Sequence, residues 1–152
     1  MTFRRFVHVS ILIAAPVLAT SGARQTARAD GAAAAVAVSI NVTAKLVEIP
    51  TKFPPDDLYD YAYVMRYQVV GGPMDKQFIL VAHYKPREAR AAIKDSMKKY
   101  VSGKVRSFHQ GDVHKLTLAP NLKPIWPGAL VDEFAATDHK SIRYFALVAD
   151  PA

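Results

Sequence analysis

The chain has 152 residues, a formal net charge of +7 at pH 7 and no cysteine. Without cysteine there can be no disulfide, thiolate nucleophile, cysteine-bound iron–sulfur cluster or lipidated cysteine of the kind that anchors bacterial lipoproteins. The basic balance suggests nucleic acid or an anionic membrane as a partner, so the position of the positive charge has to be examined first.

The first 29 residues have the features of an export signal. Arg4 and Arg5 supply a positive start, an apolar stretch runs from Phe6 to Ala19, and Ala27-Arg28-Ala29 offers a small-residue cleavage site. The apolar stretch is shorter than the ~20 residues of a membrane-spanning helix, and a proline interrupts it. A cleaved signal peptide over residues 1–29 is therefore favoured over a retained membrane anchor.

Cleavage after Ala29 would leave residues 30–152, which we predict to form a single β-rich domain. The mature protein is expected to be periplasmic or secreted, with no stable membrane insertion after processing. Cleavage after Ala23 and export by the twin-arginine route are alternatives that leave the domain unchanged. Four of the 20 basic residues and none of the 13 acidic residues lie in the leader, so the mature part carries a net charge of +3. Nucleic acid is therefore not expected as a partner.

Alternating apolar and polar residues predict three strands in the first half of the mature chain, at Val36–Ile49, Tyr59–Val70 and Lys76–Tyr84. The sequence Gly-Gly-Pro-Met-Asp at 71–75 is typical of a turn, which predicts an antiparallel hairpin from the second and third strands. The third strand is apolar on both sides and should therefore lie in the middle of the sheet.

The periodicity changes after the third strand. An apolar stripe through Ala89, Ile93 and Met97 predicts a helix over residues 86–102, with Gly103 just past its end. Further strands are predicted at 104–108, 113–118 and 141–149, and a proline-bearing loop is predicted at 119–140.

The order of these elements resembles the OB fold, a small antiparallel barrel of five strands, here with one helix between strands 3 and 4. We predict this mainly β (α+β) barrel, with a β-sandwich carrying one helix as the alternative. Within OB-like folds, VTAKLV at 42–47 and YVMRYQVVGG at 63–72 resemble the opening strand pair of exported netrin-like domains. The cysteines of that family are absent, and no functional residue is carried over from it.

Aromatic residues distinguish the second strand, where tyrosines at positions 59, 61, 63 and 67 share one face. Such rings either stack on sugars or bases or form the core of the barrel. In the 119–140 loop, Trp126 either contacts a partner or plugs the end of the barrel, and the basic residues that follow the third strand are further candidates. The candidate partner-binding residues are Tyr59, Tyr61, Tyr63, Trp126, Arg87 and Arg106.

Three histidines are candidates for a metal site. His83 ends the third strand and His109 and His114 flank a turn, so their imidazoles could meet at one rim of the barrel beside Asp112. Imidazoles combined with a carboxylate are typical ligands of a transition metal. The other interpretation is that these are scattered surface histidines, in which case no cofactor is expected.

Catalytic signatures are absent, because the sequence has no Gly-x-Ser-x-Gly elbow and no glycine-rich phosphate loop before a helix. Asp56 and Asp57 are adjacent loop residues, whose carboxylates have no fixed separation for hydrolysis. The sequence favours an exported non-catalytic domain that binds a protein or polysaccharide of the cell envelope through a barrel face and its loops. The alternatives are a periplasmic metal-binding protein that uses His83, His109 and His114, and a small exported hydrolase.

Overall fold

A computed structural model of the chain describes residues 33–34, 36, 38–51 and 60–152. The predicted signal peptide, Tyr59 and the acidic pair Asp56 and Asp57 lie outside the described residues. In the ranges that are described, no helix is long and apolar enough to cross a membrane.

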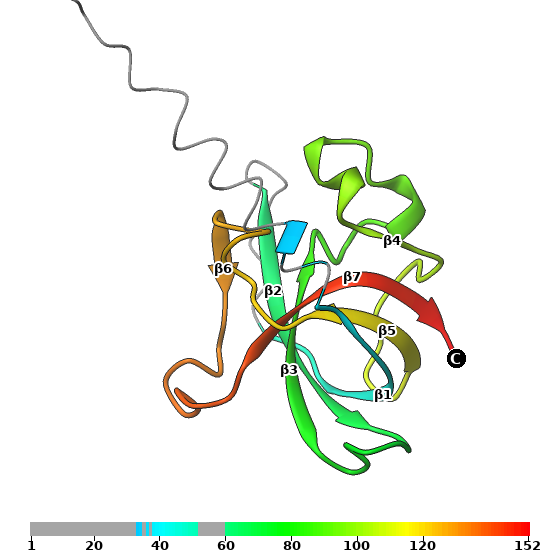
Figure 1. The fold of residues 1–152 in the computed structure, drawn as a ribbon, viewed down its shortest axis with the longest axis vertical. Coiled ribbons are helices and arrows are strands. Elements are labelled where there is room, and N and C mark those ends of the chain that lie inside the picture. The colour runs from blue at the N-terminus through cyan, green and yellow to red at the C-terminus, as the bar shows by residue number, and fades with distance from the viewer. Residues whose placement is uncertain (1–32, 35, 37, 52–59) are drawn as a thin grey trace, which may run out of the picture.

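Five strands form a partly closed ring. They are β1 (Ile40–Glu48), β2 (Tyr61–Val69), β3 (Phe78–Tyr84), β5 (Val113–Ala119) and β7 (Arg143–Pro151). The order around the ring is β1, β2, β3, β7, β5 and back to β1, and within the ring only β3 and β7 pair in parallel (Figure 1). The fold is thus the mainly β, five-stranded OB-like barrel that the sequence predicts, except that its sheet is mixed where an antiparallel one was predicted, and the β-sandwich alternative is not adopted.

Two short strands extend this sheet. β4 (Ser102–Gly103) lies parallel to β7, and β6 (Ala129–Val131), inside the predicted 119–140 loop, lies parallel to β2. The strand predicted at 104–108 is wrong. The backbone N–H groups of residues 104 and 105 both donate to the carbonyl of Ala149, at 3.0 and 3.1 Å, so the chain leaves β7 directly after β4.

The predicted helix over residues 86–102 is also wrong. The segment forms two short 3-10 helices, η1 (Arg90–Ala92) and η2 (Ser96–Lys99), with extended backbone at the residue that follows η1. The carboxylate of Asp95 accepts the backbone N–H of Met97 at 2.9 Å and the hydroxyl of Tyr84 at 2.8 Å. A side chain that caps the backbone in this way competes with helix continuation and here ties η2 to the barrel.

β2 and β3 are buried on both faces because a hydrophobic core lies on each side of them. The first core fills the barrel and includes Ala44, Leu46, Met65, Val81 and Leu116. The second core lies outside the barrel, where residues 86–101 and 119–134 cover β2, β3 and β7, and it includes Val64, Leu80, Ile93, Met97, Leu122 and Phe134. Side chains along β2 alternate between the two cores, as the pleat of a strand requires.

Two backbones approach each other closely at Gly103. Its φ is +125°, and a Cβ atom there would lie 2.1 Å from the carbonyl oxygen of Ala149. Gly103→Ala must therefore separate β4 from β7, and we expect it to lower the free energy of unfolding by at least about 2 kcal/mol, measured by chemical denaturation.

Gly72→Ala is the matched control for this substitution. Gly72 also has a positive φ, +71°, but a Cβ there would meet nothing within 4 Å. The free energy of unfolding of the control should fall only by the conformational cost of a side chain at positive φ, about 1 kcal/mol. Equal losses in the two variants would show that the contact with Ala149 does not matter.

Candidate functional site

A polar cluster lies inside the barrel, within the first core. The hydroxyl of Tyr67 on β2 lies 3.1 Å from Nε2 of His83 on β3 and 3.2 Å from Nδ1 of His114 on β5. All three residues are buried, with exposed fractions of 0 % for Tyr67 and His83 and 3 % for His114. Each residue lies on the inward-facing side of its strand, so three separate strands contribute to one hydrogen-bonded unit.

This cluster continues to the surface through Asp112. One carboxylate oxygen of Asp112 lies 3.9 Å from Nε2 of His114 and 3.4 Å from Nδ1 of the exposed His109. The same oxygen accepts the backbone N–H of His109 at 3.0 Å, which fixes the turn before β5. These residues line a cleft of about 430 Å³ together with Lys104 and Arg106. The polar chain therefore runs from the interior of the barrel to an open cleft.

Phe108 and Arg90 pack beside the buried end of the cluster. The ring of Phe108 lies 4.5 Å from that of His83 and 5.4 Å from that of His114. The buried guanidinium of Arg90 lies 5.4 Å from the centre of the Phe108 ring. It donates to the backbone carbonyls of Tyr84, Lys85 and Glu88. Burial lowers the pKa of Arg90 to about 10, so it stays positively charged at neutral pH.

The cluster itself is uncharged at neutral pH. Burial, and then the positive charge of Arg90, holds the pKa of His83 well below the ordinary value of 6.5. Burial also lowers the pKa of His114, although Asp112 opposes the shift, and burial raises the pKa of the Tyr67 phenol. Two neutral imidazoles therefore share one neutral hydroxyl.

Two of the three tyrosines predicted as partner-binding residues, Tyr61 and Tyr63, belong to the core. Tyr61 and Tyr63 are 4 % and 0 % exposed, and their rings pack edge to face with centres 4.9 Å apart. A ligand cannot stack on these two rings, so the stacking-platform hypothesis is wrong for them. Burial of Tyr61, Tyr63 and Tyr67 agrees with the alternative interpretation, that the aromatic face of this strand packs in the core.

Trp126 packs against the protein. Its ring centre lies 4.9 Å from that of Tyr84, and its Nε1–H donates to the carbonyl of Ala129 at 2.9 Å. The side chain is half-buried against the second core. Of the two candidate arginines, Arg87 is exposed on the loop after β3, and Arg106 is exposed and lines the cleft.

The histidines predicted as metal ligands come together only in part. His83 and His114 face each other across the hydroxyl of Tyr67, while His109 lies outside beside Asp112. Within the part of the chain that the structure describes, no three His, Asp or Glu side chains form a group that could hold a metal ion. Metal binding stays a prediction without a formed site, and these residues are treated below as hydrogen-bonding groups.

Sequence reasoning selected His83, His114, Asp112 and Arg106 but missed the role of Tyr67, which joins the two imidazoles. The signal was present, because the inward-facing positions of three alternating strands include Tyr67 and both histidines. Comparisons with protein-family models, curated proteins and solved structures find no match. Function is therefore argued from the geometry of the site.

Removing the hydroxyl of Tyr67 tests the energetic weight of the cluster. Tyr67→Phe keeps the ring but leaves the facing nitrogens of His83 and His114 buried without their partner. We expect the free energy of unfolding to fall by about 2–4 kcal/mol, measured by chemical denaturation at pH 7. Tyr144→Phe is the control, because Tyr144 is half-buried and its hydroxyl makes no hydrogen bond among the described residues. A similar small loss in both variants would contradict the assignment.

Trp126→Ala tests whether this residue supports the fold. Loss of the contact with Tyr84 and of the bond to Ala129 should lower the free energy of unfolding by about 2–3 kcal/mol, somewhat less than for a fully buried tryptophan. Phe78→Ala, at a 61 % exposed position, is the control and should lose much less. Unchanged stability of the Trp126 variant would favour a role in partner contact.

Proposed function

We propose that the mature protein is an exported, non-catalytic binding domain that holds a protein or polysaccharide of the cell envelope on the outer face of β1, β5 and β7. The observation that carries this proposal is the difference between the two outer faces of the barrel. OB folds commonly bind ligands on the face of strands 2 and 3. Here residues 86–101 and 119–134 cover that face, so binding is assigned to the opposite side.

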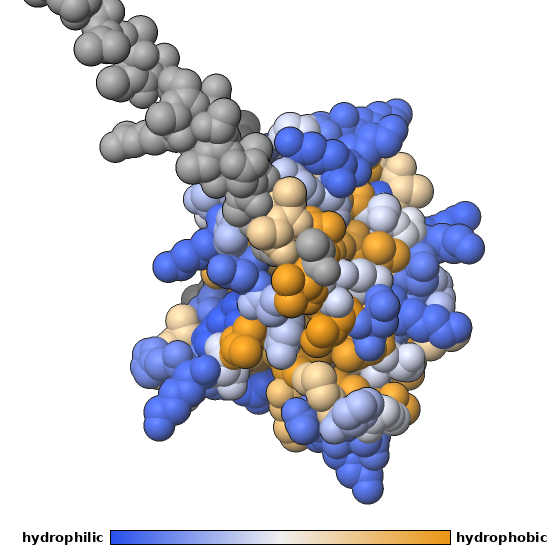
Figure 2. Space-filling model, in the orientation of Figure 1, coloured by the Kyte–Doolittle hydropathy of each residue, from blue (hydrophilic) through white to orange (hydrophobic). Residues whose placement is uncertain are grey.

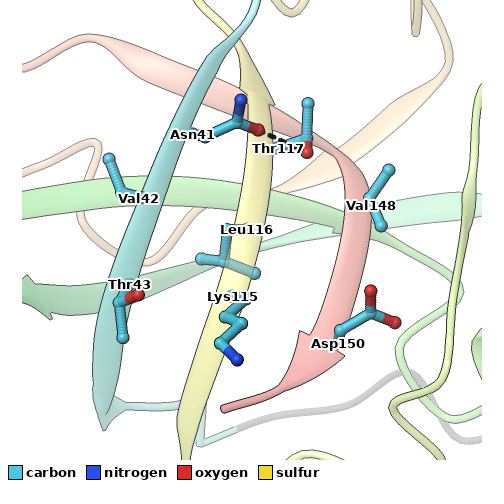
Figure 3. Close-up of a pocket in the computed structure, with 8 residues that line it drawn as sticks. All are labelled: Asn41, Val42, Thr43, Lys115, Leu116, Thr117, Val148 and Asp150. Atoms are coloured by element: carbon cyan, nitrogen blue, oxygen red, sulfur yellow. Dashed lines mark hydrogen bonds between the residues drawn. The ribbon is translucent and has the colours of Figure 1, made fainter.

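The opposite side presents a shallow groove of about 360 Å³ across three strands (Figure 3). Strand pairing arranges its side chains in two rows, which cross from β1 through β5 to β7. At one end of the groove, the hydroxyl of Thr117 donates to the side-chain oxygen of Asn41 at 2.7 Å. The rows are Asn41, Thr117 and Val148, and Thr43, Lys115 and Asp150.

The chemistry of the groove suits a polar polymer. An amide, two hydroxyls, an ammonium and a carboxylate offer both donors and acceptors, and a paired sheet holds them at fixed spacing. The carboxylate of Asp150 also accepts the backbone N–H of Lys104 at 2.8 Å. Because Lys104 lines the cleft beside His114, the groove and the cleft adjoin along β5 and β7. A shallow, elongated surface fits an extended chain better than an enclosed small molecule.

Apolar surface accompanies these polar recesses. A second recess of about 390 Å³ lies on the other side of β1, where Ile40, Val42 and Val70 line it with the turn after β2. Figure 2 shows apolar side chains near the centre of the face in view, with hydrophilic side chains around them. An apolar centre with a polar rim is typical of surfaces that bind another macromolecule.

Binding can be tested with a panel of cell-envelope polysaccharides and a purified envelope protein fraction. For the ligand that binds, the double variant Asn41→Ala/Lys115→Ala should weaken the Kd at least about tenfold, because two groups that line the groove are lost. Isothermal titration calorimetry or biolayer interferometry measures the change.

The matched control is the double variant Asn121→Ala/Lys140→Ala. It removes the same two side-chain types at exposed positions of the 119–140 loop and should leave the Kd unchanged. If both double variants weaken binding equally, or if neither does, the groove is not the binding face. Turnover of a bound polysaccharide by the wild type would contradict the non-catalytic assignment.

A further inference from the structure

The hydroxyl of Tyr67 limits the protonation states that the cluster can hold. A phenol carries one hydrogen, so it can donate to only one of the two imidazoles that face it. The other imidazole must then donate an N–H to the phenol oxygen. Two neutral imidazoles satisfy both observed distances, 3.1 Å to His83 and 3.2 Å to His114. One imidazole then donates an N–H to the phenol oxygen, and the other accepts the phenol hydrogen.

The surroundings set that direction. Nε2 of His114 faces the carboxylate of Asp112, so we assign its proton to Nε2. Nδ1 of His114 then accepts from Tyr67, and Nε2–H of His83 donates to the phenol oxygen. Nδ1 of His83 is buried and has no hydrogen-bond partner among the described residues. This fits a nitrogen that carries no hydrogen, because an N–H there would be an unpaired buried donor.

The charges around the cluster oppose any added proton at its inner end. η1 contributes the buried cation Arg90, whose charge Glu88 partly offsets, and the carboxylate of Asp112 lies at the surface end beside His114. The turn before β5 also contributes His109, and the cleft side contributes Lys104 and Arg106. A proton on His83 would therefore place a second cation next to Arg90 inside the barrel.

The segment Lys104–Asp112 lies over this end of the barrel. It has no regular secondary structure, and its Phe108 packs on both imidazoles. Two backbone hydrogen bonds hold the far end of the segment on Leu46 of β1. The N–H of Gly111 donates to the carbonyl of Leu46 at 2.7 Å, and the N–H of Leu46 donates to the carbonyl of Asp112 at 2.8 Å. The neutral imidazoles thus form the surface on which Phe108 of the segment packs.

We propose that the hydrogen-bond chain of His83, Tyr67 and His114 is an acid-sensitive latch, which holds the segment Lys104–Asp112 on the barrel at neutral pH and releases it when both imidazoles take up protons. Two protonated imidazoles would both donate to the phenol oxygen, and the phenol hydrogen would lose its acceptor. Two new positive charges would also join Arg90. This inference is independent of the binding proposal, and its failure would leave that proposal intact.

The sign of the pH dependence follows from the lowered pKa values of the two histidines in the folded protein. Between those values and 6.5, the unfolded chain binds more protons than the folded chain. Stability is therefore complete above pH 6.5 and falls as the pH drops below it. At a pH well below 6.5 but still above the folded-state values, unfolding should take up as many as about two protons.

NMR on the wild-type protein provides the first test. At pH 7, His83 and His114 should both be Nε2–H tautomers, and neither should titrate at 6.5. As the pH falls from 7.5 to about 5, the unfolding midpoint should decrease, and amide exchange corrected for its intrinsic pH dependence should rise first in the segment Lys104–Asp112. The proposal is overturned if both imidazoles titrate near 6.5, if the midpoint stays constant, or if exchange rises equally across the barrel.

Non-titrating replacements provide the second test. His83→Gln and His114→Gln should each reduce the proton uptake on unfolding by about one, so that stability depends less on pH. His139→Gln is the control, because His139 is exposed on the loop before β7, and it should leave the uptake unchanged. A variant that loses the same stability at every pH would show a purely structural role. If the variants do not fold, the wild-type titration still decides the question.

Discussion

The burial of β2 and β3 on both faces is the constraint on which the rest of the structure depends. One face fills the barrel with Tyr61, Tyr63 and Tyr67, and the other supports the second core beneath residues 86–101 and 119–134. A strand that is buried on both sides has no face left for a ligand. The same constraint therefore removes the aromatic ladder from the candidate binding residues and leaves the face of β1, β5 and β7 to be considered.

Local pattern was sufficient for the barrel. The alternation along β1, β2 and β3 predicted the three strands, and the turn at Gly71-Gly72 predicted the antiparallel pairing of β2 with β3. Local pattern failed where distant contacts decide the outcome. The apolar stripe through Ile93 and Met97 is buried as predicted, but the carboxylate of Asp95 bonds to the hydroxyl of Tyr84 and interrupts the helix.

The candidate site shows the same division. The positions of His83 at a strand end and of His114 beside a turn were enough to suggest that they approach each other, but these positions alone could not show that Tyr67 lies between them. That arrangement depends on the register of β2, β3 and β5, and β5 is far from the other two strands in the sequence. β6 escaped prediction for a related reason, because three residues parallel to β2 leave no periodic signal of their own.

β5 connects the buried cluster to the proposed binding face. Successive side chains of a strand point to opposite faces, so His114 faces the interior while Lys115 lines the groove outside. The segment Lys104–Asp112 makes a second connection, because the backbone N–H of Lys104 bonds to the carboxylate of Asp150 in the groove. Release of that segment would break this bond and leave the Oδ1 oxygen of Asp150 free to accept a hydrogen bond from a ligand. If both proposals hold, acid that opens the latch would therefore also alter the binding face, because the two share β5 and the bond between Lys104 and Asp150.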